Sequence, residues 1–271
     1  MQNRLKIWSD KRPWEEAEAE WDAGSRSSEK SHPLKVLKTL PNIPGMTEET
    51  ARGLKLKAAK YLLSHDPNRI FLRYFFKHPL KYTYRWMKSA LKKKSFVRSG
   101  DFFFYGIENK EQFLQATQEE NALFVIGFSY CHKPMECPSG RFTDACIHDP
   151  ENPICRQCFI GKSVNALPEG VIPLFIPTIH YIGEKMFELV DLHPDKKIVF
   201  LITACELTLE MFSDWGNMID IRGIGVRLDG RICNTMRAFE LSERGIKPGL
   251  TVVLPETQEQ ILSLIRELWR D

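Results

Sequence analysis

Seven cysteines are the residues of this chain best suited to chemistry, and all lie from residue 131 onward: Cys131, Cys137, Cys146, Cys155, Cys158, Cys205 and Cys233. Thiolates suit iron–sulfur clusters and zinc. The C-x-x-C pair Cys155–Cys158 lets two sulfurs grip one metal ion or cluster. The loop from Cys131 to Cys158 is polar and rich in Pro, Gly and Asp, so burial alone explains its thiols poorly. The pattern predicts a metal site.

The elements around the cysteines explain how residues so far apart could meet. Five strand-length apolar runs are expected to form strands: 122–128, 171–176, 197–203, 221–228 and 250–254. They alternate with helical stretches at 178–190, 206–214, 235–244 and 256–269. Continuously apolar strands that alternate with helices predict an α/β fold with a mostly parallel, layered, Rossmann-like sheet. The run 101–106 is expected to be a strand or an anchor.

Three cysteines follow predicted strands directly. Cys131 comes three residues after the first strand, Cys205 two after the third and Cys233 five after the fourth. Because the carboxyl ends of parallel strands share one edge, these thiols are expected to converge there. The predicted metal ligands are Cys131, Cys137, Cys155, Cys158, Cys205 and Cys233, with Cys146 as a possible addition. Burial as a small apolar side chain stays open for Cys146 and Cys205.

An iron–sulfur cluster is favoured over zinc because zinc sites usually draw on paired knuckles, and this chain has one close pair. Zinc remains the alternative, and His132 and His148 could then be ligands instead of exposed loop residues. Cys205 is expected beside a helix N-terminus, where the dipole lowers a thiol pKa. A hydrolase or transferase that uses Cys205 as nucleophile, with Glu206 or His180, is a weaker hypothesis, and no catalytic residue is assigned.

The first hundred residues have a different character. Residues 1–45 are expected to be a flexible tail, 46–100 a basic helical segment and 101–271 the cysteine-rich domain. Thr47 is a predicted N-cap, a helix is expected to run to about Ser64, and Pro67 and Pro79 are expected to open or break helices. Residues 69–98 carry ten Lys or Arg and no acid, interleaved with aromatic and aliphatic residues.

This basic segment has three interpretations. It could contact an anionic membrane surface, or less favourably a nucleic acid. It could instead pack on the domain and keep a solvated basic face. The residues expected to contact a membrane or another polyanion are Arg73, Lys77, Lys81, Arg85 and Lys88. A protein partner on the same helices is a further option, and the oligomeric state is not predicted.

Composition narrows the setting. The 271 residues have a formal net charge of only +3, so the chain as a whole does not resemble a nucleic-acid binder. The first residues lack a signal-peptide core, and long apolar runs are absent, which predicts a cytoplasmic protein, peripheral at a membrane if the basic face is used. In a reducing compartment, seven cysteines favour metal binding over disulfides. Gly223 and Gly225 lie inside a predicted strand, which argues against a dinucleotide loop.

Four motifs in order resemble an uncharacterised cysteine-rich prokaryotic family, domain of unknown function one-one-six. They are Cys131-His-Lys-Pro-Met-Glu-Cys137-Pro138, Cys155-Arg-Gln-Cys158-Phe-Ile-Gly161, Ala204-Cys205-Glu206, and Gly225-Val-Arg-Leu228 with Cys233-Asn-Thr235. The similarity covers about residues 124–253. The segment around Cys146 has no counterpart, and the family's Gly-Cys appears as Arg231-Ile-Cys233. The resemblance implies a shared cysteine site and supplies no reaction.

Together these patterns predict a metal-binding protein, with an iron–sulfur cluster and a redox or sulfur-handling role. The alternative is a zinc-stabilised, non-catalytic module that docks on a partner or on an anionic membrane. Whether the chain is an enzyme is left open.

Overall fold

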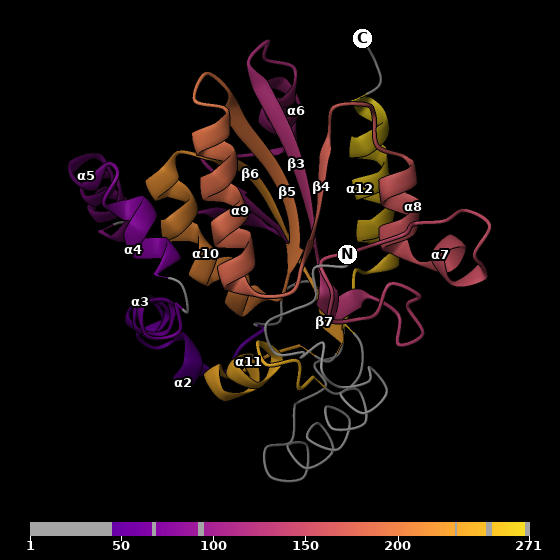
Figure 1. Cartoon of the computed structure of the whole chain (residues 1–271), viewed down its shortest axis with the longest axis horizontal. Helices are drawn as coiled ribbons and strands as arrows, with labels where there is room; N and C mark the ends of the chain where they lie inside the picture. The colour runs from indigo at the N-terminus through magenta and orange to yellow at the C-terminus, as the bar shows by residue number, and fades with distance from the viewer. Residues whose placement is uncertain (1–44, 67–68, 92–94, 231, 248–250, 269–271) are drawn as a thin grey trace.

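The computed structural model describes residues 45–66, 69–91, 95–230, 232–247 and 251–268, and the expected tail lies outside this part of the chain except at Gly45. A six-stranded sheet forms its centre, in the order β1-β2-β6-β5-β3-β4 (Figure 1). The strands are β1 (Val97–Ser99), β2 (Phe102–Tyr105), β3 (Ala122–Ser129), β4 (Ile172–Ile176), β5 (Lys197–Ala204) and β6 (Arg222–Arg227). The strands β3 to β6 are parallel, whereas β2 pairs antiparallel with both β6 and β1. The predicted α/β fold with a mostly parallel sheet is confirmed.

Burial explains the character of the central strands. Seven of the eight residues of β5 are buried, because β3 and β6 flank it and helices cover both its faces. Its alternate side chains point to opposite faces, so Phe200 packs in the core on one side and Leu201 in the core on the other. Only a continuously apolar run satisfies both cores at once.

Two helical layers complete the domain (Figure 1). One core contains side chains of α3 (Leu54–Ser64), α4 (Ile70–Phe75), α5 (Pro79–Ala90), α9 (Ile179–Leu192), α10 (Glu206–Ile219) and α11 (Met236–Ser242). The other contains side chains of α6 (Lys110–Thr117), α8 (Phe159–Asn165) and α12 (Pro255–Glu267). The N-terminal helices are therefore part of the first layer.

Some of the helix boundaries predicted for the N-terminal segment agree with the structure, and one does not. Thr47 caps α2 (Glu48–Ala51) as predicted, with its side chain accepting from the Thr50 amide. The expected single helix divides at Gly53, which has φ +69° and separates α2 from α3. Pro79 begins α5, as its fixed φ favours. Pro67 lies outside the described residues.

The structure differs from the prediction at two sheet elements. The run 250–254 does not join the central sheet, because β8 (Thr251–Val252) instead pairs antiparallel with β7 (Asp229–Gly230). Conversely, β1 lies in the range expected to be helical and pairs with β2 at the sheet edge. Three helices had no prediction: α6, α7 (Pro153–Gln157) and α8. Of these, α7 lies within the cysteine loop and carries Cys155, and α8 begins directly after Cys158.

Candidate functional site

The chain changes direction at the carboxyl ends of β3 and β5. The connection after β3 leads to α8 in one helical layer, and the connection after β5 leads to α10 in the other. Adjacent parallel strands whose helices leave to opposite faces open a crevice there, which is where α/β proteins bind ligands. Cys131 lies in the short helix η1 (Tyr130–His132) after β3, and Cys205 is the N-cap of α10 after β5.

Cys131, Cys205 and Cys233, here called the thiol triad, line one cavity of about 40 Å³ at this edge. The predicted convergence of the three strand-end cysteines is therefore what the structure has. All three are at least 92% buried. Cys205 Sγ lies 3.1 Å from the Thr208 hydroxyl, and Lys247 Nζ lies 3.2 Å from Cys233 Sγ. A buried ammonium thus faces a buried thiol.

The three thiols of the triad differ in pKa. The pKa of Cys233 is lowered because Cys205 donates a hydrogen bond to it, and Lys247 adds a hydrogen bond and a positive charge. The pKa of Cys205 is raised well above its ordinary value by that same hydrogen bond to Cys233 and by burial. Burial also raises the pKa of Cys131. The predicted helix N-terminus is present at Cys205, but the predicted lowering of its pKa is reversed, because Lys247 places the negative charge on Cys233.

The other four cysteines, here called the loop cysteines, line a second, small cavity: Cys137, Cys146, Cys155 and Cys158. Cys155 is buried, and the other three are partly exposed. Ile154, Ile160 and Gly161 complete the wall behind them. The structure therefore divides the cysteines that the sequence assigned to one site, and it places Cys146 with the loop group.

Lys133 holds the cysteine loop in shape from inside. It is 99% buried, and its Nζ donates to the carbonyl oxygens of Thr143 at 2.8 Å, Ala145 at 2.7 Å and Gly140 at 3.3 Å. The Thr143 hydroxyl donates to the Ser139 carbonyl at 2.7 Å. Burial lowers the pKa of Lys133, and the loop thiols oppose that shift. The ammonium is therefore placed to offset negative charge on thiolates of this loop.

The C-x-x-C pair is built by two short helices. The Asn152 side chain caps α7 by accepting from the amides of Ile154 and Cys155. Cys158 ends α7 and is also the N-cap of α8. A Cβ on Gly161 would lie 2.4 Å from the Cys155 carbonyl oxygen, so only glycine lets α8 pack this closely against the pair. This contact gives the Cys-x-x-Cys-Phe-Ile-Gly motif a structural reason.

The histidines proposed as zinc ligands have other partners. His132 Nε2 lies 2.8 Å from the Thr203 hydroxyl, and His148 Nδ1 lies 3.0 Å from the Cys146 carbonyl oxygen. Burial lowers the pKa of His132 to about 3, with a smaller effect from Lys133. His180, suggested as a partner of Cys205, contacts the Leu62 carbonyl at 3.2 Å instead.

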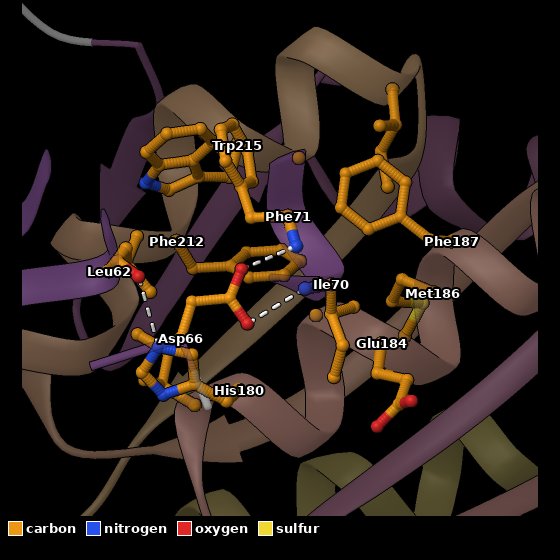
Figure 2. Close-up of a pocket in the computed structure, with 14 residues that line it drawn as sticks. Leu62, Asp66, Ile70, Phe71, His180, Glu184, Met186, Phe187, Phe212 and Trp215 are labelled. Atoms are coloured by element: carbon orange, nitrogen blue, oxygen red, sulfur yellow. Dashed lines mark hydrogen bonds between the residues drawn. The ribbon is translucent and has the colours of Figure 1, made fainter. Parts of the chain in front are cut away.

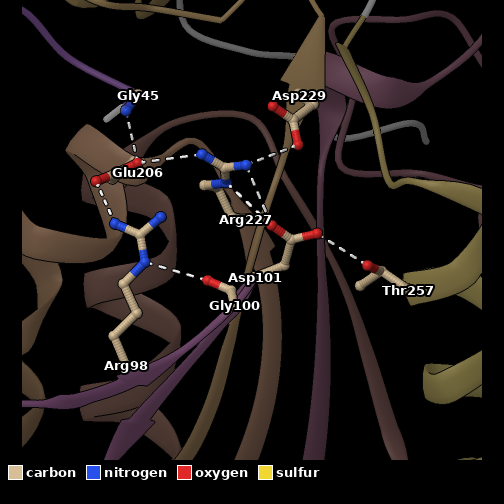
Figure 3. Close-up of polar contacts among 8 residues, drawn as sticks. All are labelled: Gly45, Arg98, Gly100, Asp101, Glu206, Arg227, Asp229 and Thr257. Atoms are coloured by element: carbon tan, nitrogen blue, oxygen red, sulfur yellow. Dashed lines mark hydrogen bonds and ion pairs between the residues drawn. The ribbon is translucent and has the colours of Figure 1, made fainter. Parts of the chain in front are cut away.

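Glu206 belongs to a buried network of charged side chains (Figure 3). Arg227 lies among three carboxylates: 3.2 Å from Asp101, 3.2 Å from Asp229 and 3.6 Å from Glu206. Arg98 adds an ion pair to Glu206 at 2.7 Å. The Glu206 carboxylate is therefore held by two arginines. It is not available as the partner that the nucleophile hypothesis for Cys205 requires.

A further apolar cavity of about 60 Å³ lies between the N-terminal helices and the α9–α10 layer (Figure 2). Phe71, Phe187 and Trp215 surround it, and the Asp66 carboxylate accepts hydrogen bonds from the amides of Ile70 and Phe71, each at 2.8 Å. Its lining is the aromatic packing that attaches α4 to the domain.

The predicted basic contact residues lie on α4, α5 and the turn between them. Lys77 pairs with Asp191, and Arg85 pairs with Asp220 at 2.8 Å. Arg73, Lys81 and Lys88 are exposed. The sequence missed that α5 also exposes an apolar stripe, Leu80, Tyr84, Met87 and Leu91, with Leu80 87% and Leu91 84% exposed. Its spacing of four, three and four residues was the available signal.

Lys133, Lys247 and Arg141 were also missed, because no spacing rule marks a loop lysine or arginine that folding buries. Among the residues that the structure describes, no three His, Cys, Asp or Glu side chains stand as a ready-made group for a metal ion. Within the same part of the chain, no helix is long and apolar enough to cross a membrane. No protein family, curated protein or solved structure matches this chain.

Proposed function

We propose that the loop cysteines Cys137, Cys146, Cys155 and Cys158 bind a metal centre, an iron–sulfur cluster, and that the protein has a redox or sulfur-handling role. The observation that carries this proposal is that all four thiols line one cavity. Four thiolates are the usual ligand set of a [4Fe–4S] cluster. A cluster would supply one-electron redox chemistry.

The donor set fits a thiolate-bound centre in charge as well as in type. Four thiolates carry more negative charge than the core of such a cluster, iron and sulfide together, neutralises, and the buried Lys133 lies among them. The cavity is only about 10 Å³, which is about the space of one water. Because this space is smaller than a cluster, cluster binding requires the loop to move outward. Cys137, Cys146 and Cys158 are partly exposed, so they lie on the side of the loop that can move.

Metal analysis of anaerobically purified protein tests this proposal. We expect a brown protein that contains iron and acid-labile sulfide. Cys155→Ala with Cys158→Ala should abolish the loading, because two of four ligands are gone. Cys131→Ser is the matched control, since this buried cysteine belongs to the thiol triad, and its loading should be unchanged. Colourless protein with stoichiometric zinc would replace the cluster by the zinc-stabilised module, and full loading of the double variant would refute the ligand set.

The exposed stripe on α5 supports a second function, docking on an anionic membrane surface. Leu80, Tyr84, Met87 and Leu91 share one helix face, and Lys81 and Lys88 lie beside them. Phe76, 68% exposed, extends the apolar surface just before the helix. An apolar face with flanking lysines is the pattern of helices that lie in the bilayer interface. The combination favours a membrane over a nucleic acid, because nothing about phosphate binding requires exposed leucines.

Vesicle co-sedimentation of the full chain tests the docking surface. We expect binding to phosphatidylcholine vesicles that contain phosphatidylserine, and weaker binding without it. Leu80→Gln and Leu91→Gln should each weaken binding about tenfold, because each leucine buries its side chain in the interface. Leu56→Gln is the matched control, since Leu56 is 79% exposed on α3, outside the stripe. Equal losses in all three variants, or no binding by the parent, would refute the membrane assignment.

A further inference from the structure

The thiol triad is a separate constellation that the loop-cysteine proposal does not use. Its members come from three places in the chain: η1, the N-cap of α10 and the loop between β7 and α11. Cys131 and Cys205 both have Cys233 and Lys247 as electrostatic neighbours, and Arg141 also acts on Cys131; Cys137 and Cys146 have other loop thiols and Lys133. The two groups are therefore distinct in position and in charge partner.

Within the triad, two thiols stand in the relation of a nucleophile and a resolving thiol. Cys205 and Cys233 line the same small cavity, and the hydrogen bond between their side chains is the largest influence on the pKa of each. Lys247, itself 97% buried, places its ammonium 3.2 Å from Cys233 Sγ. A buried ammonium is stable only with a counter-charge, and a thiolate on Cys233 supplies one. Ser242 lines the same cavity and also lowers the pKa of Cys233.

The cavity limits what can reach these sulfurs. It encloses about 40 Å³, room for a molecule of two or three heavy atoms, and the three thiols are no more than 8% exposed. Its walls include Ile176, Ile202 and Phe239. A small neutral oxidant fits such a space, whereas a bulky, charged disulfide does not.

We propose that Cys205 and Cys233 form a redox-active dithiol that is oxidised to a disulfide by hydrogen peroxide. The Cys233 thiolate attacks one peroxide oxygen, an S–O bond forms, the O–O bond breaks, and hydroxide leaves and takes up a proton to become water. The Cys205 sulfur then attacks Cys233 Sγ, the S–O bond breaks, and hydroxide leaves with the Cys205 proton as a second water. Two electrons pass from the dithiol to peroxide, and one disulfide and two waters are formed.

Peptide mapping of the full-length protein tests this proposal. Reduced protein is treated with one equivalent of hydrogen peroxide, unfolded in an alkylating reagent and digested. We expect a Cys205–Cys233 crosslink at a mass two hydrogens below the reduced pair. A parallel sample with oxidised glutathione should stay reduced. A pair that peroxide leaves reduced, a crosslink to Cys131 instead, or equal oxidation by glutathione would each overturn the proposal.

Variants separate this site from the loop site and from simple misfolding. Cys131→Ser should form the same crosslink, and so should the Cys155→Ala, Cys158→Ala variant, whatever the outcome of its metal analysis. Lys247→Met should oxidise about tenfold more slowly near neutral pH, because the thiolate loses its counter-charge. Lys247→Arg should recover most of that rate, and an unchanged rate in Lys247→Met would contradict the role of the ammonium. If a variant fails to fold, the crosslink map of the parent protein still decides.

Discussion

Single side chains set the charge state of the crevice. His132 is buried beside Lys133, and its Nε2 contacts the Thr203 hydroxyl at the end of β5. The imidazole stays neutral in the folded protein because both burial and the neighbouring ammonium oppose its protonation. In the unfolded chain the same ring regains its ordinary pKa of about 6.5. Folding therefore releases a proton at mildly acidic pH.

This difference makes a pH prediction. Between about pH 6.5 and the folded pKa of about 3, the unfolded state binds one proton more than the folded state. The free energy of unfolding should thus fall with decreasing pH across this window, by about 1.4 kcal/mol per pH unit from His132. His132→Gln, measured by urea unfolding at several pH values, should remove that part of the slope. An identical slope in the variant would show that His132 is not the group responsible.

The sequence predicts which cysteines meet at the crevice better than it predicts their protonation states. Strand-end placement identified Cys131, Cys205 and Cys233 because parallel strands end at one edge. It could not show which thiol loses its proton. That depends on Lys247, 14 residues beyond Cys233, whose burial results from the packing of segments distant in the chain.

At the level of elements, strands with two buried faces are read most reliably. The runs that became β3, β4, β5 and β6 are mostly apolar, and their ends were predicted within one residue. Short elements escaped prediction because a helix such as α7 is too brief to show a periodic pattern. The β7–β8 pairing escaped for another reason: Thr251 and Val252 have strand-like character, but their partner is a two-residue strand outside the sheet.

The junction of α7 and α8 gives a prediction at this scale. Gly161→Ala should destabilise the protein by about 1–3 kcal/mol, because its Cβ would lie 2.4 Å from the Cys155 carbonyl oxygen and the pair must shift. Metal loading should fall with it. Gly183→Ala in α9 is the matched control, since a Cβ there has no neighbour within 4 Å and alanine favours a helix. Thermal unfolding of the two variants should shift in opposite directions.

For the molecule as a whole, the buried Arg227 network fastens distant segments together (Figure 3). Asp101 precedes β2, Arg227 ends β6 and Glu206 begins α10. The network also receives the Gly45 amide at 2.6 Å and the Thr257 hydroxyl at 2.9 Å. The N-terminal helical segment and α12 are thus attached to the same charge cluster.

Removal of this arginine should be costly. Arg227→Met leaves three buried carboxylates without their shared cation, so the free energy of unfolding should fall by about 3–5 kcal/mol. Arg237→Met is the matched control, because its ion pair with Glu240 is 3.8 Å long and exposed, and its effect should be below about 1 kcal/mol. Denaturant unfolding measures both. Comparable losses would mean that the network contributes no more than a surface pair.

At the scale of the whole molecule, the sequence indicated the sheet and the crevice. It did not indicate that the cysteines divide into two sets, the thiol triad and the loop cysteines, in separate cavities. Spacing treats all cysteines near one edge as candidates for one site. Separation arises because Lys133 folds its loop into a compartment of its own, while Cys131, two residues earlier, lines the triad cavity.

Arg141 belongs to the loop that Lys133 organises, yet it donates to the backbone carbonyl of Cys131 at 3.2 Å and to that of Lys247 at 3.3 Å. The cysteine loop is thus hydrogen-bonded to the backbone of Cys131 and of Lys247, the cation of the thiol triad. If a ligand of the loop favours one oxidation state of the triad through these hydrogen bonds, the two events are linked. Thermodynamic reciprocity then requires the oxidation state of the triad to change the affinity of the loop by the same factor. Arg141 is the side chain through which such coupling between the two compartments would act.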